Sequence, residues 1–224
     1  MQKIELYVSA LEEIFVAAAN PENTESMQKY MRNHFAFLGI KTPERKALIK
    51  AFIAKYGWPS VEDLPVVVKT LWEMPAREFQ YVAIEMLVKH AKKLPENSLE
   101  LLEYCITRKS WWDSVDSLAS TVGVYFEKYP AQLPPTNARW LSSGNMWLQR
   151  SALIFQLRYR ARTDEKLLHH NILQLASSKE FFIQKAIGWS LRQYARTNPS
   201  AVQNFVATHA LPPLSRREAL KHFD

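Results

Sequence analysis

The sequence predicts an all-α protein, and three observations support that class. Only 5 glycines occur among the 224 residues, and runs that alternate apolar and polar residues, which are typical of strands, are few. Most segments instead repeat apolar residues at the i, i+3, i+4, i+7 spacing of a helix. Proline punctuates these segments where helices are expected to begin or end, at residues 42–44, 74–75, 94–95, 133–135 and 211–213.

The first segments read as helices in turn. Residues 1–15, MQKIELYVSALEEIF, have the pattern of an amphipathic helix rather than of an export signal. A helix is expected to begin at Thr42 and continue through residues 44–52, ERKALIKAF. VEDLPVVVKTLW, residues 61–72, could be mistaken for a strand at 66–68, but its flanking acids and its helically spaced Leu-Trp pair favour a helix.

Four segments, each expected to form the second helix of a helix pair, resemble one another and define a repeat. Arg45, Gln80, Gln149 and Gln184 align at intervals of 35, 69 and 35 residues. The middle interval is two periods, and its missing member falls near residue 114, while one further period reaches residues 215–223. A period near 35 is typical of paired-helix solenoids of the HEAT or armadillo kind, slightly short of their usual ~40 residues. The aligned segments are ERKALIKAF, REFQYVAIEML, WLQRSALIFQL and FIQKAIGWSLRQY.

This repeat predicts a single HEAT-like domain over residues 1–224, with a concave basic groove. Stacked helix pairs form a superhelix whose inner helices line a concave surface. The aligned polar positions would recur along that surface as a basic stripe with an acidic, aromatic interruption in its middle. The predicted stripe comprises Arg45, Lys46, Gln80, Asp113 to Asp116, Gln149, Arg150, Gln184, Lys185, Arg216 and Arg217.

The bulk composition favours a polyanionic partner. Lys and Arg outnumber Asp and Glu by 29 to 22, which gives a net charge of +7, and such an excess favours nucleic acid over simple solubility. Cys105 is the single cysteine, so neither an intrachain disulfide nor a cysteine metal cluster can form. With no export signal and no apolar run of membrane-spanning length, we expect a soluble, cytoplasmic protein.

RKSWWDSVDS, residues 108–117, combines aromatic and acidic side chains in one helical turn. Trp112 and Asp116 are four residues apart, so on a helix they share one face. Trp111 would point about 100° away and is expected to pack in the core. Asp113 is interpreted as a structural acid or an accessory polar contact, whereas Asp116 falls on the predicted basic face.

Further candidates leave two interpretations open. Gly188 precedes Trp189 in mid-helix, where glycine costs roughly 1 kcal/mol relative to alanine. Either two helices pack closely there or another molecule approaches. Arg150 and Arg192 are either phosphate ligands or residues of a solvated helix face. The sequence holds no HExxH, no GxxxxGK[ST] and no GxGxxG motif, so common metal and nucleotide sites are not indicated.

Several stretches resemble the AlkD-type family of bacterial DNA alkylation-repair glycosylases. They run in order from about residue 5 to the end of the chain: HFAFLGIKTPERK, LWEMPAREFQ, KSWWDSVDS, NMWLQRSALIFQLRY, SSKEFFIQKAIGWSLRQYARTNP and LSRREALKH. The resemblance implies a HEAT-like solenoid that binds duplex DNA in its concave basic surface. It also implies hydrolysis of the N-glycosidic bond of cationic N3- and N7-alkylated purines, without drawing the lesion into a base pocket.

The resemblance also implies roles for individual residues. Asp116 would stabilise the oxocarbenium-like sugar and position a water, with Trp112 and Trp189 offering aromatic faces to the sugar. Arg150 would hold the phosphate beside the lesion, and Tyr30 matches a family tyrosine near the DNA. The remaining basic stripe would bind the DNA backbone without sequence preference. Its members are Arg192, Arg158, Lys185, Arg45 and Lys46.

The chemistry is compatible with a monomeric enzyme that uses neither metal nor cofactor. A purine alkylated at N7 or N3 is already cationic and leaves without protonation, so no general acid is required. Two alternatives stay open at this point. One is a HEAT-repeat protein that binds distorted DNA without excising bases, and the other is a HEAT scaffold that binds an acidic protein. The chain ends soon after its last repeat segment, which is expected to affect DNA clamping more than chemistry.

Overall fold

The computed structural model describes residues 2–221 and 223, and in these residues all regular secondary structure is helical, apart from one isolated bridge between Ala36 and Ala76. The predicted all-α class is therefore confirmed. The helices form two compact units, Met1–Leu101 and Leu102–Asp224, and the boundary falls within the α6 helix, Leu99–Thr107. The prediction that the whole chain is one domain stays a prediction.

The first unit contains the helices expected from the N-terminal half of the sequence. Residues 66–68, which could have been a strand, lie inside a helix, in which Val67 and Val68 are buried and Val66 is exposed. The elements are α1 (Gln2–Ala17), α2 (Pro21–Tyr30), α3 (Thr42–Tyr56), α4 (Leu64–Glu73), α5 (Arg77–His90), and the short 3-10 helices η1 (Ala91–Lys93) and η2 (Glu96–Ser98).

The second unit contains the remaining repeat segments. The segment missing from the regular spacing begins a helix at Trp112, as the 35-residue period predicts. The elements are α7 (Trp112–Lys128), η3 (Pro130–Gln132), α8 (Leu133–Ser142), α9 (Met146–Ile154), η4 (Phe155–Arg158), η5 (Arg160–Arg162), α10 (Glu165–Leu175), α11 (Phe181–Ala195), α12 (Pro199–Thr208) and α13 (Pro213–Leu220). His222, part of the last predicted repeat segment, lies outside the described residues.

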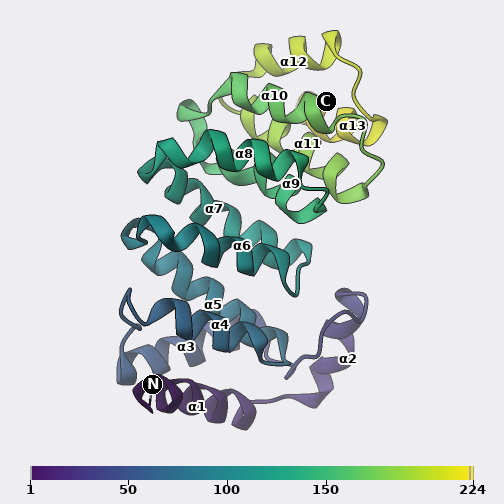
Figure 1. Cartoon of the computed structure of the whole chain (residues 1–224). Helices are drawn as coiled ribbons and strands as arrows, with labels where there is room; N and C mark the ends of the chain where they lie inside the picture. The colour runs from purple at the N-terminus through teal and green to yellow at the C-terminus, as the bar shows by residue number, and fades with distance from the viewer. Residues whose placement is uncertain (1, 222, 224) are drawn as a thin grey trace. The chain divides into compact units, whose positions relative to one another are not determined.

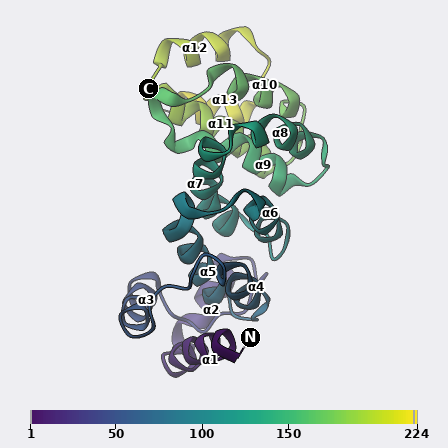
Figure 2. The same ribbon diagram turned by 60° about the vertical axis from the view of Figure 1, so that its left-hand side comes forward.

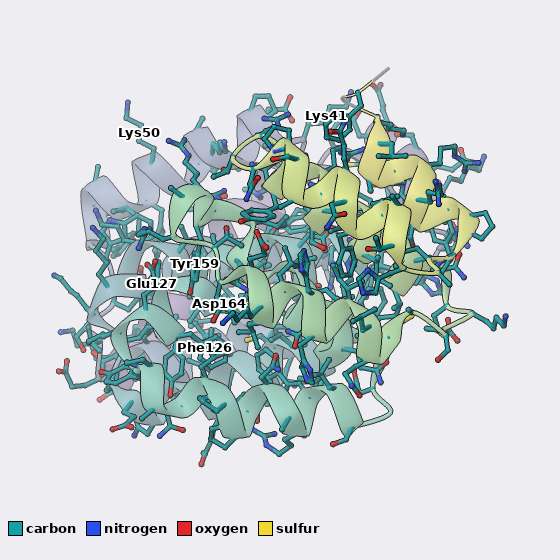
Figure 3. All side chains as sticks on the ribbon, turned by 90° about the horizontal axis from the view of Figure 1, so that it is seen from above. Lys41, Lys50, Phe126, Glu127, Tyr159 and Asp164 are labelled. Atoms are coloured by element: carbon teal, nitrogen blue, oxygen red, sulfur yellow. The ribbon has the colours of Figure 1, made fainter. Side chains whose placement is uncertain are left out.

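Within the second unit, one row of helices carries the repeat (Figures 1 and 2). In this row α7 packs against α9, α9 against α11, and α11 against α13, while α8, α10 and α12 pack against members of the row. The core between them includes Leu153, Ile187, Leu191 and Phe205, and side chains fill the space between the helices (Figure 3). Consecutive repeats therefore present corresponding residues side by side on α7, α9, α11 and α13.

The glutamines that mark the repeat have a structural role, which corrects their predicted place on the basic stripe. The side-chain amide of Gln80 is fully buried and donates to the carbonyl oxygens of Leu71, Trp72 and Met74 at 2.9–3.1 Å. In the second unit, Gln149 donates to the Leu141 carbonyl and Gln184 to the Ser178 carbonyl, both at 3.0 Å. Gln80 and Gln149 thus satisfy carbonyl groups at the end of the preceding helix, which otherwise lack intrahelical partners, whereas Gln184 bonds a carbonyl in the connection that follows α10.

A buried carboxylate organises the long connection between α2 and α3 in the first unit. Glu78, at the start of α5, accepts hydrogen bonds from the backbone N–H groups of Leu38, Gly39 and Ile40 at 3.0–3.1 Å. Its side chain is fully buried. Two sequence stretches singled out above, HFAFLGIKTPERK and LWEMPAREFQ, are therefore joined by one residue, because a buried carboxylate must find donors.

We expect Glu78→Gln to lower the free energy of unfolding by about 2–3 kcal/mol. The NH₂ group of the glutamine would replace one carboxylate oxygen, so at least one backbone N–H group would face another donor and lose its acceptor. Urea denaturation followed by circular dichroism measures the loss. Glu44→Gln is the matched control, since Glu44 accepts the Lys41 N–H in an exposed capping box and glutamine also serves in such boxes. Equal, small losses for both variants would contradict the role given to Glu78.

Candidate functional site

In the second unit, the row formed by α7, α9, α11 and α13 contains a cleft of about 280 Å³. Aromatic side chains form much of its wall, and the rest of the lining is charged. Residues from all four helices of the row contribute: Trp112 and Asp116 from α7, Arg150 from α9, Phe181, Phe182, Lys185, Trp189 and Arg192 from α11, and Glu218 from α13. The structure thus brings together Trp112, Asp116 and Trp189, the three residues expected to be catalytic.

Asp116 and Arg150 form a two-pronged ion pair across the α7–α9 contact. The Arg150 Nε and Nη2 groups donate to the two carboxylate oxygens of Asp116, each at 2.7 Å. A third donor, Nη1, bonds the carbonyl oxygen of Phe182. The Arg150 side chain is only 5% exposed, whereas that of Asp116 is 18% exposed. This geometry gives Arg150 a task that the sequence did not indicate, which is to hold the carboxylate at the cleft.

The environment of Asp116 favours its neutral form more than water does. Burial raises the pKa of Asp116 above its ordinary value, and the negative charge of Asp113 raises it further, while the hydrogen bonds and charge of Arg150 lower it. Asp113, three residues earlier in the same turn of α7, is buried and does not line the cleft. Of the two acids of the WWDSVDS stretch, only Asp116 therefore lines the cleft, and it is the one that the repeat register and the family resemblance favour.

Trp112 and Trp189 are both partly exposed in the cleft, whereas Trp111 packs against other rings. The Trp111 ring lies 5.8 Å from that of Trp147 and 5.1 Å from that of Phe182. Trp111 therefore packs against aromatic rings as expected, but it is partly exposed like Trp112 and does not belong to the fully buried core. The Arg150 guanidinium carbon is 6.0 Å from the centre of the Trp189 ring, so a cation already lies near that aromatic face.

Gly188 marks a close approach between α11 and α13, which settles its two readings in favour of helix packing. A Cβ atom at Gly188 would lie 2.4 Å from the Cβ atom of Glu218 and 2.7 Å from the carbonyl oxygen of Ser215. The Ser215 hydroxyl also donates to the Gln184 carbonyl at 2.8 Å. Without a side chain at Gly188, α13 reaches α11 closely enough to bring Glu218 into the cleft beside Trp189.

Sequence reasoning missed Glu218, which the structure makes the partner of two predicted phosphate ligands. Lys185 Nζ lies 3.0 Å and Arg192 Nη1 2.8 Å from its carboxylate oxygens. The only signal was its place in the SRREALKHF segment, where the repeat alignment pointed to the neighbouring arginines instead. Those two arginines, Arg216 and Arg217, are exposed and do not line the cleft.

Four other residues predicted to contact DNA lie elsewhere. Tyr30, at the end of α2 in the first unit, is 70% exposed. Arg45, also in the first unit, is largely buried, with its guanidinium carbon 4.5 Å from the centre of the Tyr81 ring and its Nε 3.7 Å from Glu85. Lys46 and Arg158 are exposed, and Arg158 lies on η4, outside the cleft lining. For all four, contact with DNA stays a prediction.

Across the part of the chain that the structure describes, no cluster of three or more His, Cys, Asp or Glu side chains is arranged to hold a metal ion. Over the same residues, no helix is both long enough and apolar enough to cross a bilayer.

Comparisons with known proteins show the family of this chain. The family model described as DNA alkylation repair enzyme matches residues 11–223. A solved structure of a predicted DNA alkylation repair enzyme from Enterococcus faecalis is similar to this chain, with 37% sequence identity and a TM-score of 0.83. That match covers 91% of this chain and 95% of the other. Among curated proteins, no match is found. The chain belongs to the DNA alkylation repair enzyme family.

Proposed function

We propose that the protein is a monofunctional DNA glycosylase, which hydrolyses the N-glycosidic bond of cationic N3- and N7-alkylated purines in duplex DNA. The observation that carries the proposal is the position of the Asp116 carboxylate in a cleft that Trp112 and Trp189 also line. We further propose that the enzyme acts as a cytoplasmic monomer and uses water alone, without metal or cofactor.

The proposed reaction begins with departure of the purine. Alkylation at N7 or N3 places a positive charge on the base, so the electron pair of the C1′–N bond moves onto the purine and neutralises it. The sugar becomes an oxocarbenium-like cation, which the negative charge of Asp116 stabilises. Water then adds at C1′, and Asp116 accepts a hydrogen bond from that water and aids loss of its proton.

The tryptophans contribute through their ring faces. The π faces of Trp112 and Trp189 carry negative electrostatic potential, which attracts a cation or polarised C–H groups of the sugar. Because Arg150 is tied to Asp116 through both carboxylate oxygens, its first role in this proposal is to fix the direction of the carboxylate. A contact between Arg150 and the adjacent phosphate remains part of the proposal as a second role.

The polar groups of the cleft also support excision without base flipping. Enzymes that extrude a base read its Watson–Crick edge with hydrogen bonds inside a pocket. Here the polar groups pair with each other, Asp116 with Arg150 and Glu218 with Lys185 and Arg192. We therefore propose that the cleft contacts the sugar and backbone at the lesion and leaves the base within the duplex.

The test is incubation of the purified protein with methylated duplex DNA, followed by chromatography of the released bases. We expect free 7-methylguanine and 3-methyladenine, with abasic sites left in the DNA. Salt-sensitive binding to the duplex without released base would instead indicate a DNA-binding protein that lacks excision activity. Absence of salt-sensitive binding would indicate a scaffold for an acidic protein and would refute the proposal.

A further inference from the structure

Glu218 is a buried acid that forms ion pairs with three basic side chains. Its side chain is only 5% exposed, and its carboxylate oxygens lie 3.0 Å from Lys185 Nζ, 2.8 Å from Arg192 Nη1 and 2.7 Å from Lys221 Nζ. The three cationic side chains are more exposed, at 37%, 25% and 49% respectively. Each cation therefore has one side on the carboxylate and another side accessible to solvent.

The fold places this carboxylate at the cleft by close helix packing. Gly188 allows α13 to approach α11, and Glu218 is the residue of α13 that a Cβ atom at Gly188 would strike first. Five charged side chains line the cleft: the acids Asp116 and Glu218 and the bases Arg150, Lys185 and Arg192. Three positive and two negative charges leave a net charge of +1, and without Glu218 the net charge would be +2.

We propose that Glu218 is a positioning residue that determines specificity: it neutralises and holds Lys185, Arg192 and Lys221, so that the cleft favours a cationic alkylated purine over unmodified duplex. The inference rests on the proposed function, because it concerns the charge of the lesion. Glu218 acts through the three cations and is given no contact with the reacting atoms.

The two kinds of DNA respond oppositely to the charge at this position. Affinity for unmodified duplex comes mainly from phosphates, so an additional positive charge strengthens it and makes it more sensitive to salt. A cationic purine, and the sugar cation that follows its departure, are both disfavoured by additional positive charge nearby. Although desolvation raises the pKa of Glu218, hydrogen bonds and charges from Lys221 and Lys185 hold that pKa at about 2. The carboxylate is therefore charged at any pH at which the protein would be assayed.

The first experiment compares Glu218→Gln with the wild-type protein in two measurements. For an unmodified duplex, affinity is measured as a function of salt concentration. Loss of the Glu218 charge leaves one more positive charge free to neutralise a DNA phosphate. The plot of log binding constant against log salt concentration should therefore become steeper by about 0.9, and binding should be about fivefold tighter at 0.15 M salt. For a duplex containing 7-methylguanine, kcat/KM for base release should fall on the order of tenfold, the effect of one charge several ångströms away in a surface-like dielectric.

Two further variants control for total charge and for folding. Glu127→Gln makes the same change in net charge, but Glu127 pairs with Arg162 beside Tyr159 (Figure 3), outside the cleft lining. It lies roughly 16 Å along α7 from Asp116, which is beyond the screening length of about 8 Å at physiological salt. We expect Glu127→Gln to leave base release unchanged. Glu218→Asp keeps the charge and should restore most of the wild-type salt slope.

Lys221→Gln extends the test without removing a buried group. Because Lys221 is half exposed, this variant is expected to fold, and it should change binding in the opposite direction. Affinity for unmodified duplex should fall by more than kcat/KM on the 7-methylguanine duplex, so the preference for the lesion should rise. If Glu218→Gln lost both quantities and Lys221→Gln lost both equally, the inference would be overturned and Glu218 would only stabilise the fold.

The outcome separates this inference from the proposed function. If the wild-type protein releases alkylated bases but Glu218→Gln binds unmodified duplex no more tightly, the inference fails and the glycosylase proposal stands. If no base is released by the wild-type protein while Glu218→Gln still steepens the salt dependence, the glycosylase proposal fails. In that case the role in specificity for a cationic lesion fails with it, and only charge neutralisation by Glu218 remains.

Discussion

Asp116→Asn should lose base release by roughly 10²–10³-fold while duplex binding survives, because the amide keeps the shape of the side chain but not its charge. The carboxylate is the negative group that the proposal places against the developing sugar cation. Single-turnover base release from a 7-methylguanine duplex measures the chemical step, and affinity for an uncleavable duplex measures binding. Thermal unfolding of the variant is needed beside them, because the change also disturbs the pair with Arg150.

Asp113→Asn is the matched control for that prediction. Asp113 lies in the same helical turn and is buried, but it does not line the cleft. We expect most of the rate to survive in Asp113→Asn, with the acid limb of the pH profile moved to lower pH, because the charge of Asp113 raises the pKa of Asp116. Wild-type base release by Asp116→Asn, or equal losses in the two variants, would show that the role given to Asp116 is wrong.

Arg150→Met should lower the free energy of unfolding by about 3–5 kcal/mol, because it leaves the Asp116 carboxylate partly buried without its partner. In the pH–rate profile of base release, the variant should also move the acid limb to higher pH. Activity requires the Asp116 carboxylate and is lost as pH falls through its pKa. Burial already raises that pKa, and Arg150 is the group that lowers it, so removing Arg150 raises it further.

The double variant Asp116→Asn/Arg150→Met distinguishes the ion pair from the arginine alone. Removing both charges leaves no uncompensated group, so we expect much of the stability lost in Arg150→Met to return, while base release stays low. Chemical denaturation near neutral pH measures the cycle. Additive losses in the two single variants would mean that Arg150 stabilises the fold through Phe182, whose carbonyl it also contacts, and not through Asp116.

Much of the site could be predicted from the sequence, because its core is local. Trp112 and Asp116 are four residues apart, and helical geometry alone places them on one face. The 35-residue period located the helix that carries them and placed Arg150 on the predicted stripe, and the family resemblance gave Arg150 and Trp189 their expected roles. Helix class and helix starts followed from the same short-range rules.

The partners of these residues could not be predicted in the same way. The Asp116–Arg150 pair joins residues 34 positions apart, and the contacts of Glu218 join residues 26 and 33 positions apart. The period shows which helices are neighbours but not which side chains meet. A shift of one residue turns a side chain by about 100° around the helix axis, and it then faces a different partner. The repeat alignment accordingly assigned the polar stripe to glutamines that in fact bond backbone carbonyls at or just beyond the ends of preceding helices.

The sequence by itself determined that this protein is helical, that its helices repeat, and that one turn carries aromatic and acidic side chains together. These properties depend on spacing along the chain, which hydrophobic burial and helix geometry convert directly into structure. Only the tertiary structure decided that Arg150 holds Asp116 and that Glu218 enters the cleft over Gly188. Those contacts depend on how closely two helices approach, and that distance is set by packing between residues far apart in the chain.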